Sequence, residues 1–152
     1  MLSTRSIQIL LVEDDPVHAR LIRRALGEQI DGSVVCIEHV ADGEAALEHM
    51  LGAGHSDDGG EQAGDSPDLV LLDLRLPSID GFDVLSALRA SDTTRRLPVV
   101  IVSTSDHETD INRCYGLGAN AFVTKSSDFD ELTDKMTQLS QFWLHAAELP
   151  RN

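Results

Sequence analysis

Acidic side chains follow two of the short apolar segments in this chain, where together they could bind a cation. Glu13, Asp14 and Asp15 follow one segment, and Asp73 follows another. Carboxylates placed close together repel one another unless a cation neutralises them, and Mg²⁺ prefers one or two carboxylates with water and phosphate oxygens. If the two segments lie side by side, these acids predict a site for a hard cation.

Hydroxyl and ammonium groups follow two further apolar segments. Ser103, Thr104 and Ser105 end one of them, and Thr124 and Lys125 end the other. A carboxylate can act as a nucleophile toward phosphorus, while an ammonium and a hydroxyl can stabilise the other oxygens of the transferring group. Each residue type alone is common as a helix cap or a solvated charge. Their joint occurrence at four segment ends predicts phosphoryl chemistry.

The apolar segments have the length and composition of buried strands. They are rich in Val, Ile and Leu and span residues 7–12, 33–40, 68–72, 99–102 and 121–124. Apolar residues recur at helical spacing between them: Val17, Leu21 and Ala25; Ala46, Leu47 and Met50; Val84, Leu85 and Leu88; Ile111, Cys114 and Tyr115; Leu132, Met136, Leu139 and Trp143. This alternation predicts an α/β fold with a doubly wound parallel sheet, which binds ligands beyond the carboxyl ends of its strands.

Four motifs resemble the receiver domains of response regulators. They are ILLVEDD at 9–15, LVLLDLRLPSIDG at 69–81, PVVIVSTS at 98–105 and AFVTKS at 121–126. The resemblance covers nearly the whole chain and implies the flavodoxin-like receiver fold, with five parallel strands in the order 2-1-3-4-5 and five helices. It also implies a single-domain response regulator of a two-component phosphorelay, which is a signalling protein and not an enzyme with an external substrate.

The same resemblance implies an acceptor and a metal site. Asp73 would accept the phosphoryl group from a sensor histidine kinase, and would also bind Mg²⁺. Asp14 would be a direct metal ligand, Glu13 a mostly water-mediated one, and the backbone carbonyl of Arg75 a further ligand.

The phosphoryl oxygens would contact Lys125 and the hydroxyl of Ser103, with Thr104 as the alternative hydroxyl. Ser103 would also act in a switch with Phe122, an aromatic residue that turns inward when the hydroxyl moves toward the phosphoryl group. Phe122 could equally be an ordinary core aromatic. Ser126 departs from the family pattern, because receivers commonly have a proline after this lysine.

The C-terminal segment has more apolar residues than one terminal helix needs. Phe142, Trp143, Leu144 and Leu149 therefore predict a homodimer through the C-terminal helix, with local packing as the alternative. The FWL and LP of this ending, together with LLDLRLP and TKSSD, resemble small response regulators paired with bacterial and cyanobacterial phytochromes. This resemblance implies a bacteriophytochrome-type kinase as the phosphoryl donor.

One receiver domain is expected over residues 1–147, with a mobile loop at 52–67, a C-terminal tail at 148–152 and no output domain. The signal would then leave by protein contact or by transfer to a histidine phosphotransfer protein. A phosphorylation-independent binding module remains an alternative. A flavodoxin-like carrier and a haloacid-dehalogenase-type phosphatase fit poorly, because the EDDP loop lacks a phosphate cradle and the first strand lacks D-x-D.

Composition excludes several other classes of function. The 152 residues have a formal net charge of -14, which disfavours binding to nucleic acid and to anionic membranes. No apolar run approaches the roughly 20 residues of a membrane span. Cys36 and Cys114 are expected to be buried free thiols in the cytoplasm, and the six histidines have no zinc-site spacing.

Overall fold

Strands and helices alternate along the chain as the apolar pattern predicts. The computed structural model describes residues 5–27, 33–52 and 66–150. The strands are β1 (Arg5–Val12), β2 (Ser33–Val40), β3 (Leu69–Leu72), β4 (Val99–Ser103) and β5 (Ala121–Thr124). The helices are α1 (Pro16–Gly27), α2 (Gly43–Leu51), α3 (Gly81–Ala90), α4 (Glu108–Leu117) and α5 (Phe129–Ser140), and α5 continues into the π-helical segment η3 (Gln141–Ala146).

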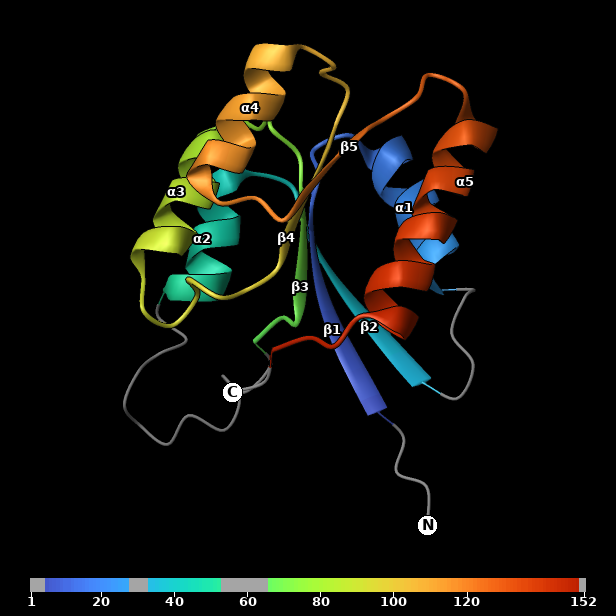
Figure 1. The fold of residues 1–152 in the computed structure, drawn as a ribbon, viewed down its shortest axis with the longest axis horizontal. Helices are drawn as coiled ribbons and strands as arrows, with labels where there is room; N and C mark the ends of the chain where they lie inside the picture. The colour runs from blue at the N-terminus through green and yellow to red at the C-terminus, as the bar shows by residue number, and fades with distance from the viewer. Residues whose placement is uncertain (1–4, 28–32, 53–65, 151–152) are drawn as a thin grey trace.

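The strands form one parallel sheet in the order β2-β1-β3-β4-β5, which confirms the predicted order. In Figure 1, α1 and α5 cover one face of the sheet, and α2, α3 and α4 cover the other. The chain leaves β1 toward β2 on one side and later returns to β3 on the other side. The strand order therefore reverses at β1, and such a reversal opens a crevice at the carboxyl ends of β1 and β3.

Burial on both faces of the sheet explains why β3 and residues 9–12 of β1 are apolar at every position. Along β1, Ile9 and Leu11 pack with residues of α1 and α5, whereas Leu10 and Val12 pack with residues of α2 and α3. Successive side chains of a strand point to opposite faces, so a strand covered on both sides needs apolar residues throughout. The strand β3 is likewise buried at all four positions.

Aspartates fix where several helices begin at the site end of the sheet. The side chains of Asp42, Asp80 and Asp128 accept hydrogen bonds from backbone N–H groups in the first turns of α2, α3 and α5. Asp15 does the same for α1, since its carboxylate lies 2.9 Å from the amide nitrogen of Val17. These caps satisfy N–H groups that have no partner within the helix.

Two residues that the helical spacing places on inner faces are exposed. Val17 is 48% exposed and Tyr115 is 49% exposed. In α1, Ala25 is buried and Leu21 packs against the core as predicted, but Ala19 and Ile22 are buried in place of Val17. The prediction was wrong here because two adjacent stripes of a short helix both contain apolar residues.

The prediction of two buried thiols is half right. Cys114 is buried, and its burial raises the pKa of the thiol to about 11. Cys36 is exposed. It lies on the edge strand β2, where Val35 and Ile37 pack against the core while Cys36 points to the opposite face. Apolar surroundings in the sequence do not reveal that an edge strand is covered on one face only.

After η3 the chain crosses the end of the sheet where the strands begin, opposite the predicted site (Figure 1). Leu149 is only 9% exposed and packs in the core cluster on the face covered by α1 and α5. The structure therefore assigns Leu149 to the core of its own chain, and not to the outer surface that the sequence predicts. Most of the expected loop at 52–67 lies outside the described residues, as do 151–152. None of the described helices could span a membrane.

Gly81 allows α3 to begin against the backbone of the predicted acceptor. A Cβ at this position would overlap the carbonyl oxygen of Asp73 and would lie 2.7 Å from the Cα of Leu74. Gly81→Ala should therefore lower the free energy of unfolding by about 1–3 kcal/mol, as overpacking does. Urea denaturation checks this, with Gly116→Ala as the control because a Cβ there meets no atom within 4 Å. Equal stability of the two variants would contradict the prediction.

Candidate phosphoacceptor site

Backbone hydrogen bonds bring four strand ends together at one rim of the sheet. The amide of Asp73 donates to the carbonyl of Val12 at 3.0 Å, which places the end of β3 beside the end of β1. The amide of Lys125 donates to the carbonyl of Ser103 at 2.7 Å, which places the end of β5 beside the end of β4. The residue types singled out in the sequence therefore come from neighbouring strands.

The ammonium group of Lys125 lies between two carboxylates. Its Nζ is 2.8 Å from Glu13 Oε1 and 3.2 Å from Asp73 Oδ2. The side chains of Lys125 and Glu13 are 2% and 1% exposed, so this is a buried ion cluster. The other carboxylate oxygen of Asp73 accepts a hydrogen bond from the amide of Leu74 at 2.7 Å. Both oxygens of Asp73 are thus held in fixed directions.

This arrangement perturbs the carboxyl group of Glu13. Burial raises the pKa of its carboxyl group from 4.5 to about 7, and the negative charge of Asp73 adds to the effect. The hydrogen bond from Lys125 acts in the opposite direction but does not offset the burial. Without a metal ion, Glu13 therefore takes up a proton near neutral pH.

Glu13 should make the stability of the metal-free protein depend on pH. Because its pKa is higher in the folded chain, the folded state binds more protons than the unfolded state between pH 4.5 and about 7. The stabilisation is complete below pH 4.5 and is lost as the pH rises through about 7. The shift corresponds to about 3 kcal/mol.

Comparison of native protein with Glu13→Gln separates the contribution of Glu13 to the pH dependence of stability from the contributions of the other carboxylates. The difference between their free energies of unfolding, measured in urea with a chelator at a series of pH values, should change by about 3 kcal/mol across that range. A difference that does not vary with pH would contradict the assigned pKa.

Three carboxylates form a cluster that could hold a metal ion. Glu13, Asp14 and Asp73 place one oxygen each within 4.8 Å of one another. Asp14 is exposed, so the cluster opens to solvent on its side, next to a cleft of about 520 Å³ that Arg75 also lines. An all-oxygen donor set suits hard divalent cations such as Mg²⁺ and Mn²⁺. The donor set therefore fits the predicted cation.

The two hydroxyls considered for the phosphoryl group have different surroundings. Ser103 is fully buried at the end of β4, and its Oγ accepts a hydrogen bond from the amide of Ser105 at 3.2 Å. Thr104 is exposed. The hydroxyl of Ser105 donates to Asp110 at 2.6 Å, which connects the loop after β4 to the first turn of α4. Ser103 thus lies inward, toward the buried part of the rim.

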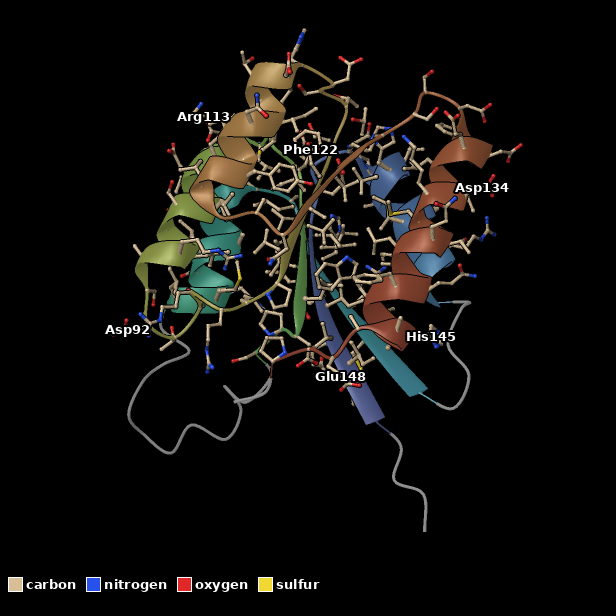
Figure 2. The ribbon with its side chains drawn as sticks, in the orientation of Figure 1. Asp92, Arg113, Phe122, Asp134, His145 and Glu148 are labelled. Carbon is tan, nitrogen blue, oxygen red and sulfur yellow. The ribbon has the colours of Figure 1, made fainter. Side chains whose placement is uncertain are left out.

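Phe122 lies on β5 on the side of α4, as Figure 2 shows. Its ring packs against the core cluster on the face covered by α2, α3 and α4, and it is only partly buried. The same residue lines a groove of about 380 Å³ that reaches Trp143 on η3. Phe122 therefore contacts the core and also borders the surface.

Two histidines lie at the site although the sequence assigns them no role in it. His18 Nδ1 is 3.0 Å from Lys125 Nζ, and His39 Nε2 is 2.7 Å from the backbone oxygen of Glu13. His18 precedes the buried Ile22 by four residues, so both lie on the inner face of α1. That spacing was the available signal for His18. We find no comparable signal for His39 on the edge strand.

A doubly wound domain with this cluster of carboxylates, lysine and serine at its strand ends has the architecture of a phosphoacceptor domain. The family of response regulator receiver domains matches residues 9–137. The chain therefore belongs to the response regulator receiver domain family.

Individual relatives resemble the chain over most of its length. It is 39% identical over 136 residues to the probable methanogenesis regulatory protein FilR2 of Methanothrix harundinacea, which covers 90% of this chain and 83% of that protein. It is 34% identical over 143 residues to response regulator Rcp1 of Synechocystis sp., and this match covers 93% of this chain and 92% of that protein.

Solved structures agree with these relationships. The phosphorylated cyanobacterial phytochrome response regulator RcpA has a TM-score of 0.82 at 35% identity and covers 98% of this chain and 100% of its own. The Mn²⁺-bound form of response regulator Rcp1 has a TM-score of 0.82 at 33% identity, with coverage of 95% and 99%. A divalent cation thus binds to a protein of this fold, in keeping with the acidic cluster described above.

Proposed function

We propose that Asp73 of this receiver accepts a phosphoryl group from a phosphohistidine of a sensor histidine kinase. The observation that carries the proposal is the Lys125 ammonium, which contacts both Glu13 and Asp73 at the rim of the sheet. A carboxylate oriented by two hydrogen bonds is a suitable nucleophile, and the ammonium can stabilise charge on the transferring group.

In the proposed step, a carboxylate oxygen of Asp73 attacks the phosphorus atom. A P–O bond forms and gives an aspartyl phosphate, while the P–N bond to the kinase imidazole breaks and its electron pair returns to the nitrogen. Lys125 exchanges its contact with Asp73 for an oxygen of the phosphoryl group. Glu13, Asp14 and Asp73, with the Arg75 carbonyl, would hold Mg²⁺, which offsets negative charge during transfer. The same groups would support hydrolysis of the aspartyl phosphate.

The response to phosphorylation would pass through Ser103 and Phe122. The hydroxyl of Ser103 turns from the amide of Ser105 toward a phosphoryl oxygen, and the ring of Phe122 turns further inward. This links the rim of the sheet to the surface formed by α4, β5 and α5. The signal then leaves by protein contact at that surface or by transfer to a histidine phosphotransfer protein.

The kinase that we propose as donor is a phytochrome in the cytoplasm. Support comes from the similarity to RcpA, described as a cyanobacterial phytochrome response regulator, over 98% of this chain. A purified phytochrome kinase, phosphorylated on its histidine with labelled ATP, should transfer the label to the native chain within minutes. An unrelated histidine kinase at equal concentration should transfer much more slowly.

The outcomes of this transfer experiment separate the parts of the proposal. Faster transfer from the unrelated kinase would contradict the proposal that the donor is a phytochrome. The proposal that Asp73 accepts the phosphoryl group would still stand. No transfer from either kinase, and none from acetyl phosphate, would indicate a phosphorylation-independent binding module.

The second part of the proposal is a homodimer formed through η3. Phe142 is 54% exposed and packs edge-on against Trp143, with ring centroids 5.2 Å apart. Trp143 and Leu144 are partly buried, because the core of the same chain packs against the inner side of this apolar surface. It continues into the groove along β5, which gives a second copy an apolar surface to cover.

Phe142→Asp should therefore weaken the dimer at least tenfold, because a charge would be buried at the centre of the interface. Light scattering at several concentrations measures the mass of native and variant protein. Phe129→Asp is the matched control, since Phe129 lies at the other end of α5 and is 50% exposed. A native chain that stays monomeric at every concentration would contradict the dimer.

A further inference from the structure

The ammonium of Lys125 contacts a third group, for which the proposed chemistry has no role. His18 Nδ1 lies 3.0 Å from Lys125 Nζ, in addition to the oxygens of Glu13 and Asp73. The lysine side chain is 2% exposed, so each N–H of its ammonium needs a partner within the protein. In the part of the chain that the structure describes, these three contacts match the three N–H donors.

The contact determines which atom of the imidazole carries a proton. An ammonium has three donors and no acceptor, so Nδ1 of His18 must accept this hydrogen bond. The ring therefore uses Nδ1 as its acceptor, which leaves Nε2 as the atom that carries a proton. Asp15 Oδ2 lies 3.5 Å from the same Nδ1. Two acceptors do not bond to each other, so the shorter contact with Lys125 is the hydrogen bond that orients the ring.

The first turn of α1 holds His18 in place. The carboxylate of Asp15 accepts hydrogen bonds from the backbone amides of Val17 at 2.9 Å and His18 at 3.3 Å. The bond from His18 is the main reason that the pKa of Asp15 is lowered. Ala19 and Ile22 then bury the inner face of the helix against the sheet. The backbone that carries the imidazole is thus anchored on two sides.

We propose that His18 is a positioning residue for Lys125, which keeps the ammonium aligned with the acceptor during phosphoryl transfer. This inference rests on the proposed role of Asp73. When the phosphoryl group arrives, one N–H of the ammonium turns to its oxygen, and the bonds to Glu13 and His18 hold the nitrogen in place. With Glu13 alone, the flexible lysine stem lets the ammonium leave its productive position, and displacement of a charged group slows transfer.

Substitutions of His18 in the full chain test this role. With acetyl phosphate and Mg²⁺, His18→Leu should be phosphorylated roughly tenfold more slowly than native protein, the effect of losing one hydrogen bond to a charged group. His18→Asn should recover about half of the native rate or more, because its amide oxygen is an acceptor near the place of Nδ1. His49→Leu, at an exposed position of α2, is the control and should keep the native rate.

A double substitution distinguishes positioning from general support of the fold. In a Lys125→Met background, His18→Leu should cause no further slowing, because the group that it positions is gone. A second tenfold loss in that background would overturn the inference, as would an Asn variant as slow as the Leu variant.

The result for the native chain keeps the two hypotheses apart. If native protein is phosphorylated and His18→Leu reacts at the same rate, the positioning role is wrong while the proposed function stands. If native protein is not phosphorylated at all, the proposed function itself is wrong.

Discussion

Asp73→Asn is expected to abolish phosphorylation of this chain. The amide that replaces the carboxylate is a poor nucleophile, and removal of a nucleophile typically slows a reaction roughly a thousandfold or more. After incubation with acetyl phosphate and Mg²⁺, the intact mass of native protein should increase by one phosphoryl group. The mass of the variant should stay unchanged, and a chelator should prevent the gain in native protein.

Asp68→Asn is the matched control for this substitution. Asp68 lies just before β3, at the opposite end of the strand from Asp73, and its carboxylate accepts a hydrogen bond from the amide of Gln8 at 2.8 Å. The Asn side chain can also accept this bond. The control should therefore fold and take up one phosphoryl group, and a gain of mass in Asp73→Asn would disprove the assigned acceptor.

Lys125→Met should impair both the chemistry and the stability of the domain. Loss of the ammonium removes a charge that stabilises the transferring group, which should slow phosphorylation about a hundredfold. It also leaves the buried carboxylates of Glu13 and Asp73 without their counter-charge. Breaking such a buried pair should lower the free energy of unfolding by about 3 kcal/mol at pH 8 in the presence of a chelator.

The chain has only one other lysine, Lys135, which provides the control. Its ammonium donates to the carbonyl of Thr124 at 2.7 Å, close to the site but without a carboxylate partner in that contact. Lys135→Met should keep the native rate of phosphorylation. If Lys125→Met reacted as fast as this control, the ammonium would have no part in phosphoryl transfer.

Much of the fold could be predicted because the apolar residues of each strand indicate in the sequence that the strand is buried. A strand must be apolar at every position where both of its faces are covered, and residues 9–12, 69–72 and 99–102 meet that requirement. Strand order did not follow from these patterns and was inferred from the resemblance to receivers. The candidate residues Glu13, Asp14, Asp73, Ser103 and Lys125 could be singled out because polar groups at the end of a buried strand are conspicuous in the sequence.

The features that were missed depend on geometry that short patterns do not contain. The approach of His18 to Lys125 requires α1 to lie beside the end of β5, although more than a hundred residues separate them. The exposure of Cys36 depends on which strand forms the edge of the sheet. The burial of Leu149 depends on the path of the chain after η3, which returns that residue to the core on the face covered by α1 and α5.

The position of Trp143 gives this protein a built-in optical reporter. It is the only tryptophan of the chain, and its indole lies edge-on against Phe142 and lines the same groove as Phe122. Indole fluorescence responds to the polarity and quenching of its surroundings. Emission from the unlabelled protein therefore reports on the surface around η3 and β5, and it follows changes there in real time while the chemistry proceeds at the rim of the sheet.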